Sequence, residues 1–398
     1  ILCSPFQPPD RHFVLGPAGP TGEIRDGRRP SESFIPVPAQ TKGSGDGQVA
    51  IDFDVTGERI QRNDLINEIR SDVDLWRGRG YPGVTPYTRK LLEHWAGGPS
   101  TRDDPVFFCQ REAVETAIFI AESAGRSGQR DRRPIIDREN EAHNDGLARV
   151  ALKMATGSGK TVVMAMLIAW QTINKVNLRR DNRFTNRFLV VTPGITIRDR
   201  LRVLQPSDPL NYYRERDLVP ADLWGALDQA RIVITNYHTF LHREVREAQG
   251  VSRKTKNILT AGKTTNPFVE TEDQMVNRVL RGLNGTGAVV VLSDEAHHCY
   301  RDRPVVNPDD LAMIEKDDEK RNEDARVWFR GIQAVRRKVG VKAAYDLSAT
   351  PYYLKGSGYN EGFIFPWTVS DFSLMDAIES GIVKVPRVPV DDDAAGDQ

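Results

Sequence analysis

The feature that most constrains the fold is a series of short apolar segments separated by longer stretches with helical periodicity. Five such segments, each rich in β-branched or aliphatic residues, lie at residues 148–154, 188–192, 232–235, 288–293 and 344–348. Runs of this kind are typical of strands that are buried on both faces. Because strands and helices alternate, the sequence predicts βαβ units and an α/β fold whose mostly parallel sheet has helices on both faces.

The composition divides the chain into regions. Residues 1–60 are rich in Pro, Gly and charged residues, so we expect an extended or partly disordered segment. Residues 61–105 carry helical periodicity and are expected to form a helical accessory region, which makes the N-terminal region partly mobile and partly helical. The α/β domain is expected at residues 106–370, with an insertion near residues 250–287. Residues 371–398 are interpreted as the start of a linker.

Helix signals are clearest in the accessory region and after the fourth apolar segment. One helix is predicted from about Asn63 to Trp76, and a second opens at Thr85-Pro86 and runs toward Trp95. A charged stretch at residues 309–338 is predicted to form two further helices, at 315–326 and 327–337.

Charge and cysteine content exclude several classes of protein. The chain has 55 Lys and Arg residues and 55 Asp and Glu residues, so binding to nucleic acid would need a local basic patch. Three scattered cysteines form neither a disulfide framework nor a CxxC metal site, which fits a reducing cytoplasm. No apolar run is long enough to span a membrane, and no signal peptide opens the chain. Since the first residue is Ile1, we expect a fragment of a longer, cytoplasmic protein.

A glycine-rich loop, Met154-Ala-Thr-Gly-Ser-Gly-Lys-Thr161, follows the first apolar segment. Its backbone N–H groups and the start of the next helix are suited to phosphate oxygens. Lys160 would neutralise the β- and γ-phosphates of ATP, and the Thr161 hydroxyl would bind Mg²⁺. The other residues expected to hold the phosphates are Thr156, Gly157, Ser158 and Gly159. Met154 occupies a position where the general phosphate-loop pattern has Gly, a substitution that the helicase-type variant of the loop tolerates. A glycine-rich turn without function is the alternative, and the strand–loop–helix context argues against it.

An acidic motif, Asp294-Glu-Ala-His297, follows the fourth apolar segment. Ligands of open α/β sheets bind beyond the carboxyl ends of the strands, where this motif falls. Asp294 is the expected Mg²⁺ partner and Glu295 the base that positions the attacking water, while His297 is suited to couple the nucleotide to a neighbouring motif. The run His297-His298-Cys299 suggests a metal site, but no second cluster with ligand spacing exists, so a hydrogen-bonded network is the preferred interpretation.

Two further motifs support a nucleotide site. Gln110 precedes a predicted helix at residues 111–122, and its carboxamide can pair with the N6/N7 edge of adenine. The hydroxyls of Ser348 and Thr350 follow the last apolar segment and can hydrogen-bond toward the acidic motif. We therefore predict that Gln110 selects ATP and that Ser348 and Thr350 couple its state to movement.

Candidate contacts to nucleic acid lie at the ends of the second and third apolar segments. Thr192-Pro193-Gly194 and Thr235-Asn236 would offer hydroxyl, amide and backbone groups to phosphates, which position a nucleic acid without reading its sequence. Arg198 is a candidate in the basic stretch nearby, although such stretches are commonly solvated surface. The other arginines of this stretch are Arg179, Arg180, Arg183, Arg187, Arg200 and Arg202.

Together these motifs resemble the series found in superfamily-two helicases of the DEAD/DEAH-box type. The segments 107–113, 293–300, 345–351 and 366–381 are more specifically similar to the restriction (Res) subunit of type III restriction enzymes. The resemblance covers about residue 60 to the end. It implies a first RecA-like domain, ATP and Mg²⁺ as cofactors, and an ATP-driven motor on double-stranded DNA. It also implies a methyltransferase (Mod) subunit as partner, and a second RecA-like domain and a nuclease domain further along.

The end of the chain departs from the family pattern. No motifs of a second domain follow Ser348, no nuclease constellation is evident, and an arginine finger typically contributes about 10³ to 10⁵ in rate. We therefore expect this chain alone to bind ATP and Mg²⁺, to turn ATP over slowly and to cut no DNA. Two interpretations stay open beside this one: a lobe of a stand-alone DNA or RNA helicase, and a phosphate-loop module that is no motor.

Overall fold

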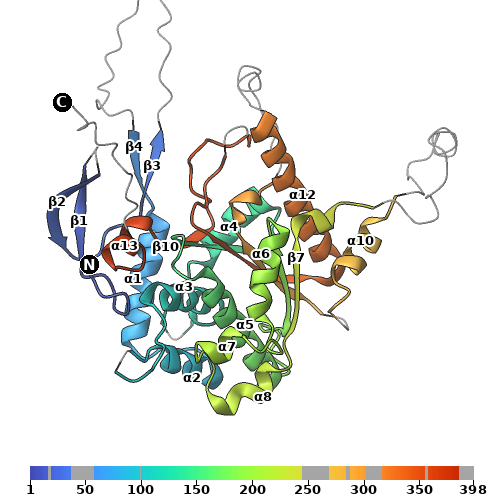
Figure 1. Ribbon diagram of the computed structural model, residues 1–398, viewed down its shortest axis with the longest axis horizontal. Helices are drawn as coiled ribbons and strands as arrows, with labels where there is room; N and C mark the ends of the chain where they lie inside the picture. Colours follow the sequence, from blue (N-terminus) through green and yellow to red (C-terminus); the bar gives the residue numbers. More distant parts are fainter. Residues whose placement is uncertain are drawn as a thin grey trace, which may run out of the picture.

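A six-stranded sheet forms the centre of the molecule (Figure 1). In this computed structural model, the strand order is β10-β5-β9-β8-β6-β7, and every neighbouring pair is parallel. The strands are β5 (Arg149–Met154), β6 (Arg187–Thr192), β7 (Arg231–Asn236), β8 (Val289–Asp294), β9 (Val341–Ser348) and β10 (Thr368–Phe372). The structure describes residues 1–16, 19–36, 58–98, 100–126, 128–243, 269–283, 287–301, 316–354 and 357–384. The predicted α/β fold and all five predicted strands are confirmed.

Helices cover both faces of this sheet because alternate strand residues point to opposite sides. On β6, Phe188 and Val190 belong to one apolar core, whereas Leu189 and Val191 belong to the other. The first core is completed by helices that include α3 (Phe108–Ile118) and α5 (Lys160–Asn177). The second is completed by α10 (Glu272–Val279) and α12 (Lys316–Val339), which lie together on the far side of the sheet in Figure 1. This is the layer arrangement of a RecA-like domain.

The accessory helices form where their sequence signals predict. Helix α1 spans Asp64–Gly78 and α2 spans Pro86–Trp95. The Thr85 hydroxyl caps α2 by accepting a hydrogen bond from the Thr88 amide, and Pro86 occupies the first helical position, where its missing N–H costs nothing. Both helices pack on the first core through fully buried tryptophans, Trp76 and Trp95.

Further helices connect these elements. They are α4 (Arg133–Asn144), α6 (Ile195–Arg200), α7 (Tyr212–Glu215) and α8 (Trp224–Leu227). Helix α12 runs without interruption where two helices were predicted, and the first part of that charged stretch, residues 309–315, lies outside the described residues. Most of the predicted insertion also lies outside them, apart from α10. No helix in the described part of the chain has the length and apolar character that a membrane crossing needs.

The first 36 residues contain more structure than their composition suggests. Strands β1 (Arg11–Gly16) and β2 (Gly19–Asp26) form an antiparallel hairpin, and β3 (Glu32–Pro36) pairs with β4 (Glu58–Arg62). Strand pairing and ion pairs to the main domain take the place of an apolar core in ordering this segment. Residues 37–57 lie outside the described residues, so the expectation of disorder there stays untested.

The sheet continues past residue 370, where the sequence suggested that the domain ends. Strand β10 runs to Phe372 and pairs with β5, and helix α13 (Leu374–Glu379) follows. The strand is hard to detect in the sequence because it contains Ser370 and Asp371, both buried. The Asp371 carboxylate is compatible with burial because Ser31 and Lys153, from other segments, reach it. The division into domains otherwise stays a prediction.

Candidate nucleotide site

The phosphate loop joins β5 to α5 at the carboxyl edge of the sheet. Gly157 and Gly159 have φ angles of 84° and 90°, in the left-handed region that glycine enters without strain. Gly159 directly precedes α5, so the loop leads into the N-terminus of an 18-residue helix. The Ser158 side chain is buried, and its hydroxyl donates to the Ala155 carbonyl at 2.7 Å. The Ser158 amide also donates to the Ala155 carbonyl, at 3.2 Å, so Ser158 shapes the loop with both its side chain and its backbone.

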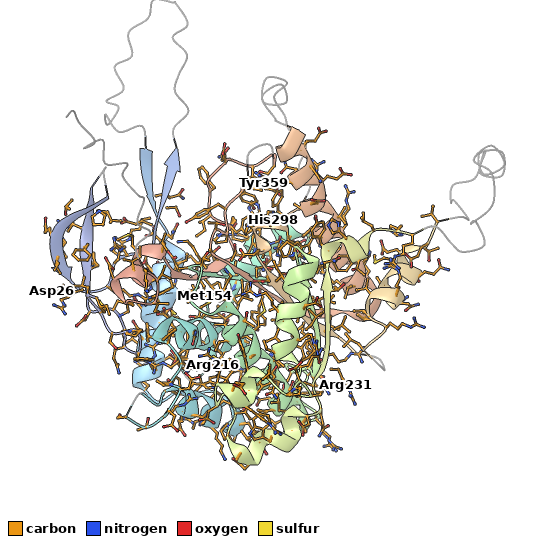
Figure 2. All side chains as sticks on the ribbon, viewed as in Figure 1. Asp26, Met154, Arg216, Arg231, His298 and Tyr359 are labelled. Carbon is orange, nitrogen blue, oxygen red and sulfur yellow. The ribbon has the colours of Figure 1, made fainter. Side chains whose placement is uncertain are left out.

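Met154 shows why the usual glycine is dispensable at this position. Its side chain is fully buried in the first core, as the last residue of β5. In Figure 2, Met154 lies in the interior of the molecule among densely packed side chains. The backbone bends only from Thr156 onward, so the departure from the general pattern leaves the loop geometry intact.

An ion pair brings the phosphate loop and the acidic motif together. The Lys160 Nζ lies 2.8 Å from Glu295 Oε1, although 135 residues separate them in the chain. Glu295 has a φ of 52°, a left-handed conformation that costs a residue with a side chain about 1 to 3 kcal/mol and occurs preferentially at functional sites. The bend turns the chain directly after β8, where Asp294 ends the strand.

Asp294 lies in surroundings that disfavour its negative charge. Burial and the neighbouring Glu295 raise the pKa of its carboxyl to about 6, and Lys160 opposes this increase only in part. A cation would relieve this cost, and carboxylate and hydroxyl oxygens are the ligands that Mg²⁺ prefers. Asp294 and Thr161 are thus a chemically suitable pair for Mg²⁺ brought by ATP.

The acidic motif is connected to the end of strand β9 through His297. Its Nδ1 lies 2.9 Å from Ser348 Oγ, which also accepts a hydrogen bond from the Thr350 amide at 3.1 Å. Burial and the adjacent His298 lower the pKa of His297 to about 4, so its imidazole is neutral at pH 7. The residues predicted to couple the motifs, His297 and Ser348, are therefore in direct contact, whereas Thr350 takes part through its backbone.

The suggestion of a metal site at His297-His298-Cys299 finds no support. Among the residues that the structure describes, no group of three or more His, Cys, Asp or Glu side chains is arranged to hold a metal ion. Burial raises the pKa of the Cys299 thiol to about 12. Its carbonyl accepts a hydrogen bond from Arg149, which makes Cys299 part of the buried framework under the site.

Gln110 is held against the phosphate loop. Its Nε2 donates to the Ser158 carbonyl at 3.0 Å, and its Oε1 accepts from the Phe107 amide at 3.0 Å. A Cβ on Gly159 would lie 2.2 Å from Gln110 Nε2, so this approach requires glycine at position 159. The glutamine predicted to recognise adenine thus lies beside the loop predicted to bind the phosphates.

The candidate nucleic-acid contacts lie at the ends of adjacent strands. Thr192 on β6 is in register with Asn236 on β7, but both side chains are buried, as is that of Thr235. The Thr192 hydroxyl donates to the Gly194 carbonyl at 2.9 Å, and that of Thr235 donates to Thr239 Oγ1 at 2.8 Å. These side chains support the strand-end loops. Contact with nucleic acid stays a prediction. Half-buried Pro193 and the loop backbone are better placed for such contact than these buried side chains. The Arg198 side chain lies outside the described part.

Sequence reasoning missed the groups that support the loop from below. Lys153 of β5 is buried and pairs with Asp371 of β10 at 2.6 Å, and the Phe372 carbonyl accepts a hydrogen bond from the Ala155 amide at 2.9 Å. One signal was available: Lys153 interrupts the apolar run from Val150 to Met154, and a charge buried in a sheet requires an opposite charge nearby.

The phosphate loop and the acidic motif meet at one edge of a parallel sheet, and their coupling motif ends the strand next to both. This arrangement defines a helicase-like ATP-binding domain. Residues 107–352 match the family described as type III restriction enzyme, res subunit. Since the match covers more than half of the chain, the protein belongs to this family, whose domain is an ATPase of the helicase type. No curated protein sequence matches the chain.

Proposed function

We propose that this chain is the ATP-binding lobe of an ATP-dependent DNA translocase of the type III restriction kind. The observation that carries the proposal is the contact of 2.8 Å between Lys160 and Glu295, which unites the two halves of an ATP site. Membership of the family supports ATP as the nucleotide.

Each residue of the site has a role that its surroundings favour. Lys160 binds the β- and γ-phosphates, with the backbone N–H groups of the glycine-rich loop around it. Glu295, at the bend after β8, accepts a proton from the attacking water and orients it. Mg²⁺, held by Thr161 and Asp294, would neutralise phosphate charge. His297 passes the state of this site to Ser348 through their hydrogen bond.

The partners follow from the family rather than from this site. We propose that double-stranded DNA contacts the loops after β6 and β7, beside Pro193 and Asn236, and that a methyltransferase (Mod) subunit assembles with the whole protein in the cytoplasm. The buried threonines of these loops fix the backbone that would face DNA phosphates.

Replacing Lys160 tests the ATP site. Lys160→Ala removes a charged hydrogen bond to phosphate, which is worth about 1.5 to 3 kcal/mol, so ATP affinity should fall about 10- to 100-fold. Isothermal titration with ATP and Mg²⁺ measures this. Lys175→Ala is the matched control, because Lys175 lies on the same helix but its Nζ contacts the Arg179 carbonyl at the opposite end. An unchanged affinity in Lys160→Ala would remove the basis of the proposal.

A further inference from the structure

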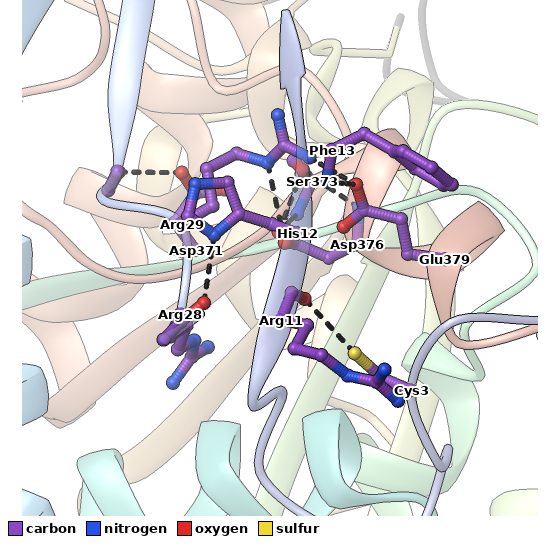
Figure 3. A network of polar contacts seen from close by, with 12 residues as sticks. Cys3, Arg11, His12, Phe13, Arg28, Arg29, Asp371, Ser373, Asp376 and Glu379 are labelled. Atoms are coloured by element: carbon purple, nitrogen blue, oxygen red, sulfur yellow. Dashed lines mark hydrogen bonds and ion pairs between the residues drawn. The ribbon is translucent and has the colours of Figure 1, made fainter. Parts of the chain in front are cut away.

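A short segment between β2 and β3 connects the N-terminal hairpin to three elements of the main domain. We call Arg28, Arg29 and Ser31 the clasp. Figure 3 shows Arg28 and Arg29 together with Asp371 and Glu379. Both terminal nitrogens of Arg28 donate to the Glu112 carboxylate on α3, the second at 2.6 Å. Arg29 pairs with Glu379 of α13, and the Ser31 hydroxyl donates to Asp371 of β10 at 2.6 Å. The clasp therefore joins α3, α13 and β10.

The pair of Arg28 with Glu112 is almost completely removed from water. The side chains are 13% and 5% exposed. Burial alone would raise the pKa of Glu112, but the guanidinium of Arg28, with those of Arg70 and Arg77, lowers it to about 2. A buried carboxylate that loses its partner is strongly destabilised, so Glu112 and the helix that carries it are held in place by Arg28.

Helix α3 is also the helix that carries Gln110, two residues before Glu112. The N-terminal segment contacts its first turn a second time, because the Pro5 carbonyl accepts a hydrogen bond from the Phe108 amide at 2.7 Å. That amide belongs to the first turn of the helix, where backbone N–H groups have no acceptor within the helix itself. The ring of Phe6 packs on Phe107, with the ring centroids 5.6 Å apart. The position of Gln110 thus depends on residues about 80 to 105 positions earlier in the chain.

Gln110 retains the hydrogen-bonding capacity to read a base. A carboxamide has two N–H donors and two acceptor lone pairs. The contacts to Ser158 and Phe107 use one donor and one acceptor, so one of each is left for the N6/N7 edge of adenine. Such a paired contact discriminates only if the side chain is held within about 0.5 Å of its place.

We infer that Arg28 is a positioning residue for adenine: through Glu112 it fixes α3 and Gln110, and so sets the preference for ATP over GTP. The inference rests on the proposed ATP site. Phosphate contacts come from the loop and Lys160, so loss of Arg28 affects base discrimination more than triphosphate binding. A residue that only stabilised the fold would change the affinities for both nucleotides alike.

The test is titration of ATP and GTP, each with Mg²⁺, into the wild type and the Arg28→Ala and Arg28→Lys variants. Arg28→Ala should reduce the ratio of ATP to GTP affinity about tenfold and change GTP affinity less than about twofold. Arg28→Lys keeps the positive charge and should recover most of the wild-type ratio. Gln110→Ala gives the ratio expected when recognition is lost. Arg278→Ala is the control for stability. Arg278 forms a largely buried pair with Glu270, 21% and 12% exposed, and contacts the chain just after β7 rather than α3.

An equal fall in both affinities in Arg28→Ala, or an unchanged ratio, would overturn the inference while leaving the ATP site in place. A wild type without preference for ATP would overturn it as well. A wild type whose ATP binding is insensitive to Lys160→Ala would instead contradict the proposed function.

Discussion

Glu112 shows how a buried carboxylate depends on the arginines around it. The Phe108 ring beside it has three guanidinium groups within 5.7 Å of its centroid, from Arg28, Arg77 and Arg111. The carboxylates of this cluster, Glu112 and Glu115, are almost completely buried. The cluster therefore favours the ionised form of Glu112.

The stability of the protein should consequently depend on pH through Glu112. Its pKa falls from 4.5 to about 2 on folding. The ionised carboxylate therefore stabilises the folded protein above pH 4.5, by an amount on the order of 3 kcal/mol. This stabilisation is lost as the pH falls toward 2. Glu112→Gln should be less stable than the wild type at pH 7, and the difference should shrink between about pH 4.5 and pH 2. Urea unfolding at several pH values measures it. Glu23→Gln, which changes an exposed ion pair, is the control. A difference in unfolding free energy between Glu112→Gln and the wild type that did not vary with pH would contradict the prediction.

At the residue scale, the sequence predicted groups whose neighbours in the chain identify them. Lys160, Asp294, Glu295 and His297 stand in motifs with fixed order, and the ends of parallel strands bring such motifs together. Arg28 and Lys153 belong to no motif, and their partners lie 84 and 218 residues away. Nothing local identifies their partners, so only the fold reveals these pairs.

Among the elements, α12 packs closely on the turn after β7. Gly331 of α12 faces the ring of Phe240, and a Cβ at this position would lie 2.1 to 2.5 Å from three ring carbons. Any side chain would push the helix away from the sheet. The absence of a side chain here, within a helix, is thus a requirement of packing.

Alanine substitutions at two helical glycines should have opposite effects. Gly331→Ala should lower the free energy of unfolding by about 1 to 3 kcal/mol, since overpacking outweighs the better helix propensity of alanine. Gly225→Ala in α8 is the matched control. Its Cβ would meet no atom within 4 Å, so the variant should be neutral or more stable by up to about 1 kcal/mol. Urea unfolding compares them, and equal effects of the two substitutions would show that Phe240 does not constrain the helix.

Five of the six strands could be predicted because each contains a run of apolar residues. Strand β10 could not, since its buried Asp371 is neutralised by Lys153 and bonded by Ser31, residues far apart in the sequence. The hairpin of β1 and β2 escaped prediction for a related reason. Strand β2 is mostly exposed and β1 only half-buried, and contacts such as that of the Phe13 amide with Glu379 hold the hairpin to the domain.

At the scale of the whole molecule, the N-terminal segment and α13 are one structural unit. The Leu2 and Cys3 amides donate to the Glu379 carbonyl, and Ile1 lies against Gly381. Val383, beyond α13, lies close to Gly157 of the phosphate loop. In Figure 1 the N-terminus accordingly lies beside α13. Binding at the loop and docking of the N-terminal segment are thus expected to influence each other.

ATP should therefore slow hydrogen exchange in the N-terminal segment. If docking favours ATP binding, then ATP must favour docking by the same factor. With ATP and Mg²⁺, exchange at residues 1–16 should be slower, and residues 224–227 of α8 should not change. Hydrogen exchange followed by mass spectrometry measures both, and Arg28→Ala should weaken the effect. Equal exchange with and without ATP would mean that the two regions are independent.

The contact between Arg29 and Glu379 also fixes an order of events during synthesis. The two residues are 350 positions apart, so at about 5 to 20 residues per second a ribosome needs roughly 20 to 70 seconds to make one after the other. Throughout that interval the N-terminal segment has no helix α13 to dock on. A segment rich in proline, glycine and charge can wait in water without aggregating, whereas an apolar one could not. The composition that suggested disorder therefore suits a segment that is synthesised early and docks on the domain only after α13 has been made.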